Sequence, residues 1–285
     1  MRSGFVSLIG KPNVGKSTIL NLLVNKKVSI VTPKAQTTRN NILSLIDGKD
    51  YQIVIEDTPG LHTAKTSLGK SMNKKVNEAI EDADIVVLII SSHDAIDEVT
   101  LGAFLKRKID IVVLNKIDLM RLPEVNDAKN KLHNLFPKAQ LIEMCAKDGF
   151  NKDELLNQII KRLPIGPKYY PDASVLKDDV FYAKEIIREK VLFLLNEEVP
   201  HNIAIYIKDI KRKKESMLID ANIIVSKDSH KGIVIGKNGQ MIKKIGTKAR
   251  EELEKYFNKR IFLELNVKVK KDWLNSSRDL KELGY

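Results

Sequence analysis

The segment that most restricts the fold is Gly10-Lys-Pro-Asn-Val-Gly15-Lys16-Ser17, which matches the pattern G-x-x-x-x-G-K-[ST]. It follows a β-rich run, Phe5 to Ile9, and precedes a helical run, Thr18 to Val24. In such a strand–loop–helix unit, successive backbone N–H groups and the helix N-terminus point at bound phosphate groups. A glycine-rich turn without a ligand is the alternative. Two later segments disfavour it, so the sequence predicts a nucleotide-phosphate site in an α/β domain.

The first 163 residues alternate short β-rich runs with longer amphipathic segments, as is typical of a parallel sheet with crossover helices. Runs rich in Val and Ile are suited to burial on both faces of a sheet. Five or six strands are expected, and the clearest runs are Phe5 to Ile9, Tyr51 to Ile55, Ile85 to Ile90, Ile109 to Leu114 and Leu141 to Met144. We therefore predict a doubly wound, mostly parallel sheet over residues 1–163.

A proline-rich segment, Pro164-Ile-Gly-Pro-Lys-Tyr-Tyr-Pro171, then interrupts regular structure, because proline removes a backbone donor and fixes φ. We place a linker at 164–177 and a second domain, with a C-terminal tail, at 178–285. Its apolar periodicity predicts a helix over 178–199, strands over 203–208 and 217–225, helices over 232–245 and 247–257, and a strand over 261–269. The resulting order, α-β-β-α-α-β, is that of an α+β domain.

The tetrapeptide Asp57-Thr58-Pro59-Gly60 ends the second expected strand. We expect the Asp57 carboxylate to lie beside the phosphate loop and to hold Mg²⁺ through water, and the Gly60 N–H to meet a γ-phosphate. By itself the tetrapeptide is a common turn sequence, but its spacing after the phosphate loop makes it a strong signal. Ser17 is the expected hydroxyl ligand of the same ion, and Lys16 bridges the outer phosphates.

The segment Asn115-Lys116-Ile117-Asp118, after the fourth expected strand, selects the base. Its Asp118 carboxylate can accept hydrogen bonds from N1–H and the 2-amino group of guanine. Adenine has an acceptor at N1 and no 2-amino group, so it would leave a desolvated carboxylate unpaired at a cost of several kcal/mol. Lys116 is expected over the base, with the Asn115 amide tying this strip to the phosphate loop. The expected ligand is GTP or GDP.

Together with Cys145-Ala146-Lys147, which is similar to the Ser-Ala-Lys box of GTPases, these segments resemble a Ras-like small GTPase domain. The resemblance implies that the Ala146 N–H reads guanine O6, and Cys145 replaces the usual serine. It implies a nucleotide site composed of Gly10, Lys11, Pro12, Asn13, Val14, Gly15, Lys16, Ser17, Thr18, Asp57, Thr58, Pro59, Gly60, Leu61, Asn115, Lys116, Ile117, Asp118, Cys145, Ala146 and Lys147.

The segment from Lys34 to Arg39 resembles the first switch of bacterial ribosome-associated GTPases, and a threonine there completes the magnesium shell. We favour Thr38, with Thr37 as the alternative, so the expected metal ligands are Ser17, Thr38 and Asp57, and the expected catalytic groups are Lys16, Thr38 and Gly60. Leu61 stands where Ras-like enzymes have a water-orienting glutamine, which predicts slow intrinsic hydrolysis. His62 is the nearest polar substitute. In related GTPases an asparagine at the place of Asn13 helps to hold K⁺, whereas the simpler interpretation is that Asn13 only bonds the loop.

Basic residues concentrate in the second half: residues 201–250 hold 12 Lys and Arg against 4 Asp and Glu, within a chain of net charge +12. Such a surplus favours a polyanionic partner, although a merely solubilising face is the alternative. In the same region Gly236-Lys-Asn-Gly239 forms a G-x-x-G loop between apolar helical segments, which resembles the RNA-contacting loop of type II K-homology domains. The expected RNA-binding residues are Lys231, Ile233, Ile235, Gly236, Lys237, Asn238, Gly239, Lys243 and Lys244.

The chain resembles the bacterial Era family of GTPases along essentially its whole length. The resemblance rests on the Ras-like domain, the linker with Tyr169-Tyr170-Pro171, the stretch Glu185 to Lys190 and the G-x-x-G loop. The resemblance implies binding to the single-stranded 3′ end of small-subunit ribosomal RNA, a role in maturation of the small ribosomal subunit, Mg²⁺ as cofactor and a monomeric protein. It also implies a cytoplasmic location with some peripheral membrane contact.

Other classes of protein fit less well. A tandem GTPase of the Der type needs a second phosphate loop, and none occurs after residue 163. A non-catalytic RNA-binding module would not need intact Lys16, Ser17, Asp57 and Asp118. The longest apolar run has six residues, against about 20 for a membrane span, and the single cysteine agrees with a reducing compartment. We therefore expect a cytosolic GTPase that binds RNA.

Overall fold

The computed structural model describes residues 1–285 except 35, 173–175, 177 and 197. Contacts divide these residues into two units. The first comprises Met1–Ser29, Thr38–Thr63 and Met72–Lys177, and the second comprises Ile30–Thr37, Ala64–Ser71 and Asp178–Tyr285. The predicted boundaries of 1–163, 164–177 and 178–285 remain predictions, since two short segments of the N-terminal half group with the second unit.

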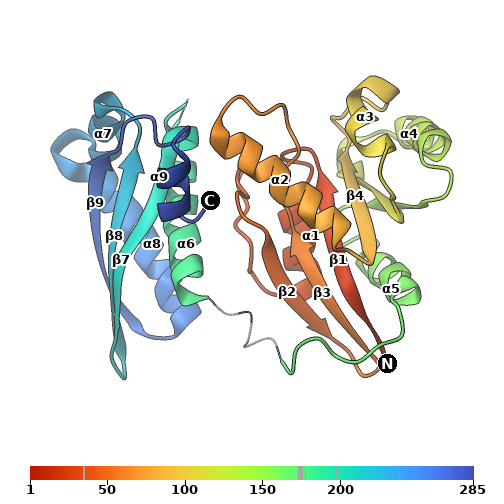
Figure 1. Ribbon diagram of the computed structural model, residues 1–285, viewed down its shortest axis with the longest axis horizontal. Helices are drawn as coiled ribbons and strands as arrows, with labels where there is room; N and C mark the ends of the chain where they lie inside the picture. The colour runs from red at the N-terminus through yellow and green to blue at the C-terminus, as the bar shows by residue number, and fades with distance from the viewer. Residues whose placement is uncertain (35, 173–175, 177, 197) are drawn as a thin grey trace. The chain divides into compact units, whose positions relative to one another are not determined.

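The first unit contains a six-stranded sheet of order β2-β3-β1-β4-β5-β6 (Figure 1). All neighbours pair in parallel except β2 and β3, which are antiparallel. The strands are β1 (Arg2–Gly10), β2 (Ile42–Asp47), β3 (Tyr51–Asp57), β4 (Ile85–Ser91), β5 (Ile111–Asn115) and β6 (Gln140–Met144). The predicted doubly wound, mostly parallel sheet is confirmed, and β2 adds an antiparallel edge.

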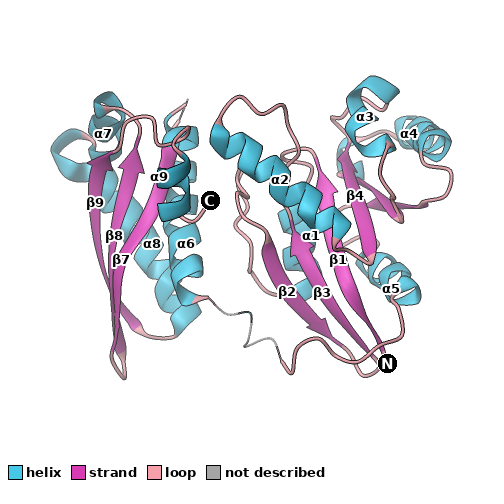
Figure 2. Ribbon diagram, in the orientation of Figure 1, coloured by secondary structure: helices cyan, strands magenta, loops and turns pink. Residues whose placement is uncertain are grey.

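Helices cover both faces of this sheet (Figure 2). One face carries α1 (Lys16–Val24) and α5 (Lys152–Arg162), and the other carries α2 (Ser67–Glu81), α3 (Glu98–Leu105) and α4 (Leu122–Leu135). The β4 sequence IVVLIIS is buried at every position, because helices lie on both sides of it. The carboxyl ends of the parallel strands all meet at one edge of the sheet, where the phosphate loop, Asp57 and Asn115 follow β1, β3 and β5.

The segment 164–170 packs against β1 and β3 of the first unit. Arg2 bridges Ile165, and the Gln52 amide donates to the Tyr170 carbonyl at 2.8 Å. The Tyr169 ring lies edge-on to Phe5, with 4.7 Å between ring centroids. The first half of the predicted linker is therefore bound to β1 and β3, while 173–175 and 177 lie outside the described residues.

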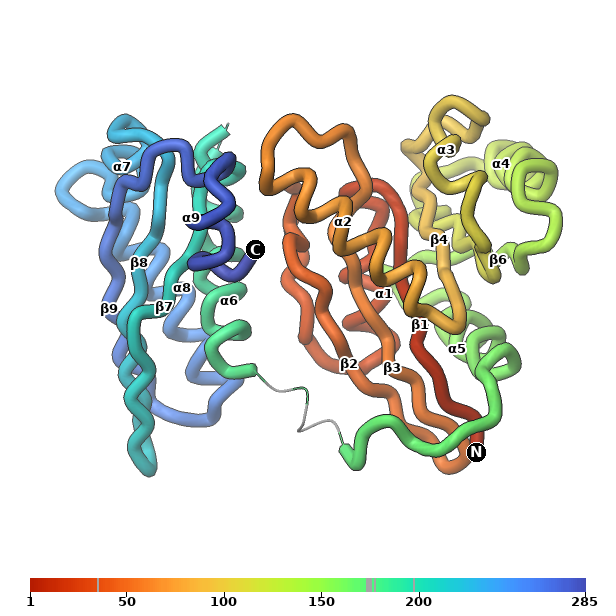
Figure 3. The backbone as a smooth tube through the Cα atoms, viewed as in Figure 1, coloured from red at the N-terminus to blue at the C-terminus, as the bar shows by residue number. Residues whose placement is uncertain are grey.

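The second unit has the predicted α-β-β-α-α-β order (Figure 3). It contains α6 (Asp179–Leu194), β7 (Ile203–Arg212), β8 (Ser216–Val225), α7 (Asp228–Ile235), α8 (Gln240–Phe257) and β9 (Arg260–Val269), followed by α9 (Ser277–Glu282). Its sheet has the order β7-β8-β9, with β7 antiparallel and β9 parallel to β8. Alternate residues of β8, such as Ile219, Ala221 and Ile223, are buried against α6 and α8.

Two helix boundaries differ from those predicted. The expected interruption by the glycines of the G-x-x-G loop is present at Gly236 and Gly239, which have φ of 73° and 75°. The second expected break, at Gly246, is wrong. Gly246 stays inside α8, where an added Cβ would lie 3.5 Å from Leu265. The helix predicted to reach residue 199 ends at Leu194, because Leu195 has an extended backbone conformation. Pro200 instead lies in a 3-10 helix, Val199–Asn202.

The predicted C-terminal tail is folded onto the second unit. Trp273 is fully buried, and its Nε1–H donates to the Asn202 carbonyl at 3.3 Å. The Trp273 and Tyr285 rings stack with centroids 5.9 Å apart. None of the described helices is long and apolar enough to cross a membrane.

Candidate nucleotide site and nucleic-acid interface

The phosphate loop leaves β1 at Gly10 and enters α1 at Lys16. Its two terminal glycines have φ of 151° and 106°, in the region that favours glycine. A Cβ on Gly10 would lie 2.3 Å from the Ile89 carbonyl oxygen, and one on Gly15 would lie 2.3 Å from Asn115 Nδ2. These glycines therefore allow the loop to pack directly on the ends of β4 and β5.

The Lys16 side chain is buried within this loop. Its Nζ donates to the Lys11 carbonyl at 2.8 Å and to the Gly10 carbonyl at 3.3 Å. Burial lowers its pKa to about 8, against the opposing effect of the Asp57 and Asp94 carboxylates. A bound phosphate would favour the charged form of this amine, and the two carbonyls that accept from it hold it within the phosphate loop.

Three hydroxyl groups surround the Asp57 carboxylate. Its Oδ2 accepts hydrogen bonds from Ser17 at 2.6 Å, from Ser29 at 2.8 Å and from Thr38 at 3.3 Å. Burial raises the pKa of Asp57, although Lys16 and the hydroxyls oppose that rise. Its Oδ1 is buried without a hydrogen-bond partner. A set of carboxylate and hydroxyl oxygens with a buried, incompletely bonded carboxylate fits a small hard cation such as Mg²⁺.

The two candidate switch threonines occupy different places. The Thr38 hydroxyl lies 3.0 Å from Ser17 Oγ, within the Asp57 cluster. The Thr37 hydroxyl lies 2.6 Å from Thr32 Oγ1 and donates to the Lys34 carbonyl at 2.6 Å. Ser29, which no sequence motif indicates, joins the cluster only because the chain after α1 returns to β3.

The loop after β3 packs tightly on the phosphate loop. A Cβ on Gly60 would lie 2.5 Å from the Pro12 nitrogen, and the Leu61 N–H donates to the Gly10 carbonyl at 3.1 Å. The Leu61 side chain packs against the cluster of buried residues under α2, α3 and α4. His62 Nδ1 lies 2.9 Å from the Gly60 carbonyl oxygen, so its ring is engaged with its own loop. Thr58 donates to the Leu8 carbonyl at 2.8 Å, which anchors the start of this loop to β1.

Asn115 joins three segments of the site. Its Nδ2 donates to the Val14 carbonyl at 2.8 Å, and its Oδ1 accepts from the Ala146 N–H at 3.0 Å. The neighbouring Lys116 has φ of 63°, and its Nζ donates to the Asn13 carbonyl at 2.7 Å. The phosphate loop, the segment after β5 and the segment after β6 are thereby held together at the expected base site.

The Cys145 thiol lies between two carboxylates. Its Sγ is 3.2 Å from Asp118 Oδ1 and 3.2 Å from Asp148 Oδ2. Burial and these carboxylates raise the pKa of the thiol, so it remains a hydrogen-bond donor near neutral pH. Asp118 itself is exposed at the start of a 3-10 helix, Ile117–Leu119, and Lys147 is exposed beside it. The thiol therefore contacts the carboxylate expected to read guanine.

In the second unit, the G-x-x-G loop connects α7 to α8 through a short 3-10 turn, Lys237–Gly239. A Cβ on Gly236 would lie 2.7 Å from Met241 Cβ, whereas one on Gly239 would meet no atom within 4 Å. Gly236 is thus required for packing inside the protein, and Gly239 faces open space. The predicted basic residues Lys231, Lys237, Lys243 and Lys244 are exposed, as are Ile233 and Asn238, while Ile235 is half-buried.

A groove of about 320 Å³ lies between α8 and β9, one helical turn beyond this loop. Leu263 and Leu265 line it from the strand, and Lys243, Thr247 and Arg250 line it from the helix, together with Ile242 and Gly246. Sequence analysis had identified only Lys243. The signal was available, since residues 243, 246, 247 and 250 follow helical spacing and 263 and 265 alternate with exposed positions.

Comparison with protein-family models identifies two regions of the chain. Residues 5–116 match a family described as 50S ribosome-binding GTPase, and residues 198–274 match the KH domain. The first match covers the phosphate loop and the segment through Lys116, and the second covers the G-x-x-G loop and the groove.

Curated relatives match over the whole chain. GTPase Era of Clostridium kluyveri is 43% identical, with 100% of this chain and 99% of the relative covered. GTPase Era of Syntrophus aciditrophicus is 42% identical, with 100% and 95% covered.

Solved structures give the same result. An Aquifex aeolicus Era variant bound to GDP.AlF4⁻ is 37% identical, with a TM-score of 0.94 over 100% of this chain and 99% of that chain. Era in complex with MgGDPNP and nucleotides 1506–1542 of 16S ribosomal RNA is 38% identical, with a TM-score of 0.94 and the same coverage.

Proposed function

The chain belongs to the Era family of GTPases, and from this premise we propose that it binds the single-stranded 3′ end of small-subunit ribosomal RNA. It is a GTP hydrolase that forms GDP and phosphate. It acts in assembly and maturation of the small ribosomal subunit, and the bound nucleotide controls its affinity for RNA. The related Era structure with nucleotides 1506–1542 of 16S ribosomal RNA supports this choice of partner.

The observation that carries the RNA assignment is the groove beside the G-x-x-G loop. Gly239 opens onto free space, which allows a nucleic-acid backbone to approach the loop closely. Lys243 and Arg250 supply positive charge along the helix side, and Leu263 and Leu265 supply an apolar surface on the strand side. Such a groove suits unstacked bases with their phosphates beside the helix.

At the nucleotide site, Asp118 and Ala146 select guanine, and Lys16 and the amides of the phosphate loop bind the phosphates. We assign the metal ligands to Ser17, Thr38 and Asp57, the latter through water, because these side chains form one oxygen cluster. Bound Mg²⁺ would neutralise phosphate charge there. Ser29 holds the Asp57 carboxylate in place from the opposite side of the cluster.

Hydrolysis without a partner should be slow. Leu61 offers no group that can orient water, its side chain packs in the core, and His62 is engaged with the Gly60 carbonyl. The catalytic groups that we propose the chain itself presents to a γ-phosphate are Lys16, Thr38 and Gly60. An additional cation or an RNA-supplied group therefore has to compensate for the missing glutamine.

We propose K⁺ at the phosphate loop as that additional cation, held in part by Asn13. Asn13 has φ of 63° and stands at the exposed tip of the loop, where its carbonyl already accepts from Lys116. GTP hydrolysis should be clearly faster in KCl than in NaCl at equal ionic strength, and Asn13→Ala should remove the difference while GDP affinity is largely kept. Identical rates in both salts, with and without RNA, would exclude this role.

We further propose that the protein is a cytoplasmic monomer. Its net charge of +12 would support transient contact with the anionic cytoplasmic face of the membrane. Sedimentation of the protein alone tests the monomeric state, and co-sedimentation with acidic vesicles tests the membrane contact.

The RNA assignment is tested with a labelled RNA oligonucleotide corresponding to the 3′ end of the small-subunit ribosomal RNA, with its complementary sequence as control. Fluorescence anisotropy should show preferential binding of the 3′-end sequence. Because Lys and Arg neutralise phosphates, affinity should fall as salt rises, with a slope that decreases by about one for each phosphate-contacting cation removed, as in Lys243→Ala. Equal binding of both sequences would mean that the protein binds RNA non-specifically and would contradict the proposed preference for the 3′ end.

A further inference from the structure

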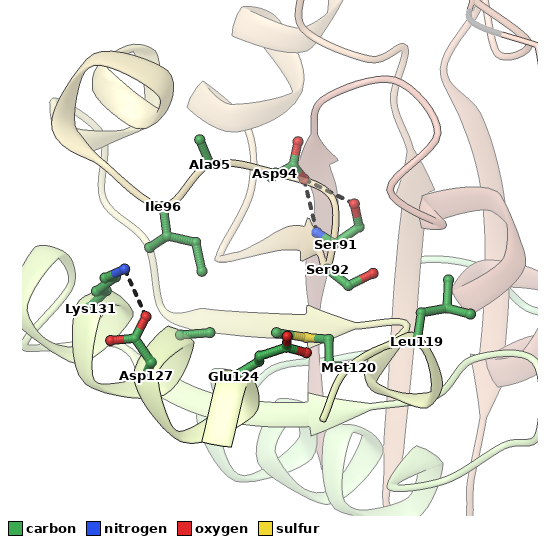
Figure 4. A pocket seen from close by; sticks show the side chains of 11 residues that line it. Ser91, Ser92, Asp94, Ala95, Ile96, Leu119, Met120, Glu124, Asp127 and Lys131 are labelled. Atoms are coloured by element: carbon green, nitrogen blue, oxygen red, sulfur yellow. Dashed lines mark hydrogen bonds and ion pairs between the residues drawn. The ribbon is translucent and has the colours of Figure 1, made fainter. Parts of the chain in front are cut away.

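A pocket of about 460 Å³ lies between the segment after β4 and the start of α4, beside the predicted nucleotide site, since its lining residue Leu119 directly follows Asp118 and its lining residue Asp94 acts electrostatically on Lys16. Figure 4 shows residues 91–96 on one side and residues 119–131 on the other. Ile96, Leu119 and Met120 give the pocket apolar walls. Its volume lies within the range of about 300–1,000 Å³ that is usual for ligand pockets. None of the residues that line it is among the predicted nucleotide contacts or the predicted RNA-binding residues.

Large apolar side chains are exposed around the same place. Val99, in the first turn of α3, is 95% exposed, and Leu122, at the start of α4, is 73% exposed. Leu119, which also lines the pocket, is 58% exposed. Isolated exposed apolar residues are common on protein surfaces, but a group of them on or next to the segments that line a pocket is typical of an interaction site.

The charged groups of the lining are mainly acidic. Asp94, Glu124 and Asp127 line the pocket together with one cation, Lys131. Lys131 pairs with Asp127 at 2.7 Å, as Figure 4 shows. Asp94 instead accepts from the Ser91 N–H at 2.9 Å, and Glu124 accepts from the Arg121 N–H at 2.7 Å. Two of the three carboxylates thus bond neutral backbone donors in the part of the chain that the structure describes.

This acidic lining contrasts with the rest of the chain, whose net charge is +12. Residues 91–98 contain Asp94, Asp97 and Glu98 and no Lys or Arg. A nucleic acid or an anionic membrane would be repelled here. A cationic partner would be attracted, and its apolar side chains could cover Val99 and Leu122.

We propose that this pocket docks a basic segment of another protein, with an aliphatic side chain of that segment in the pocket and its Lys or Arg side chains against Asp94, Glu124 and Asp127. A protein segment fits better than a small cation because the exposed apolar residues extend beyond the pocket, along the first turns of α3 and α4. The pocket belongs to the first unit and the G-x-x-G groove to the second, and the two share no lining residue.

The probe is a fluorescent peptide with a single Leu among Lys, Gly and Ser residues, titrated with the full-length protein. One control peptide has Glu in place of every Lys, and a second has Ser in place of Leu. Asp127→Lys and the double variant Val99→Ser, Leu122→Ser should each weaken binding about tenfold. Glu78→Lys on α2 is the matched control, because Glu78 is also an exposed carboxylate paired with a lysine four residues away.

The expected result is binding of the Lys–Leu peptide that falls with salt, is weaker for both control peptides and is unaffected by Glu78→Lys. GDP affinity measured on the same variants shows that they are folded. Equal binding of the Lys–Ser peptide, or equal loss in Glu78→Lys, would overturn the proposal. NMR chemical-shift changes of the Val99 and Leu119 amides on addition of RNA would also overturn it, because they would assign the surface to RNA. Concentration-dependent self-association that Val99→Ser abolishes would overturn it as well, because it would assign the surface to a second copy of the chain.

Discussion

The sulfur of Cys145 is the hydrogen-bond donor to the Asp118 carboxylate, where a serine would supply an oxygen. A thiol is a weaker hydrogen-bond donor than a hydroxyl. Its single proton is shared here between Asp118 and Asp148, each 3.2 Å from the sulfur. The carboxylate that we propose to read the base is therefore oriented less firmly than a serine at position 145 would orient it.

Cys145→Ser should tighten GDP binding by about fivefold, or ~1 kcal/mol, because a hydroxyl donates more strongly to Asp118. Cys145→Ala should weaken binding by a similar factor, because the carboxylate loses a donor. Stopped-flow release of a fluorescent GDP analogue measures both effects. Asp148→Asn, which alters the other acceptor of the thiol without touching the base, serves as the control. If serine and alanine had the same effect, the thiol would have no orienting role.

At the scale of the element, α8 connects the loop and the groove of the second unit. It begins at Gly239, whose φ of 75° sets the turn from the loop, and it places Lys243 and Arg250 along the groove. Its buried side, with Ile245, Ala249 and Leu253, packs on the sheet. One helix therefore both closes the core and presents cations to a ligand.

Gly239→Asp should weaken RNA binding at least about tenfold while GDP affinity is unchanged, because a carboxylate would project into the space that a phosphate would occupy. Anisotropy with the 3′-end RNA measures the effect. Gly102→Asp on α3 controls for the added carboxylate, since a Cβ there also meets no atom within 4 Å, and Gly239→Ala controls for the strain of a side chain at a φ of 75°. Gly236→Asp is a poorer test, because its Cβ would collide with Met241 and disturb the fold. Unchanged RNA affinity in Gly239→Asp would remove this loop from the interface.

For the whole molecule, the central question is how two sites in one chain influence each other. Thermodynamic linkage requires that, if a GTP analogue raises RNA affinity by some factor, RNA raises affinity for the analogue by the same factor. No particular arrangement of the two units is needed for that statement. The proposed control of RNA binding by nucleotide state can therefore be measured from either site.

RNA affinity should be higher in the protein loaded with a non-hydrolysable GTP analogue than in the protein loaded with GDP, by about 5-fold or more. The reverse titration, of the two nucleotides with and without RNA, should give the same ratio. Gly239→Asp should reduce that ratio toward one without changing affinities in the absence of RNA. Equal RNA affinity in both nucleotide states would mean that the two sites act independently.

The sequence by itself predicted the phosphate loop, the Asp57 and Asn115–Asp118 segments, the doubly wound sheet and the α-β-β-α-α-β order. These are local features: a few consecutive residues fix the backbone conformation, and hydrophobic periodicity indicates which faces are buried. Helix ends were less predictable. A break was expected at Gly246 as well as in the G-x-x-G loop, but only Gly236 and Gly239 have a positive φ, whereas Gly246 stays helical within α8.

Only the tertiary structure brought together residues that are distant in sequence. Ser29 and Thr38 meet Asp57, whereas Thr37 bonds within its own loop, because the chain after α1 passes over the end of β3. The groove needs α8 and β9 side by side, and the acidic pocket needs the segment after β4 to face α4. Local propensity carries no information about such pairings, since they depend on how buried faces pack across the whole domain.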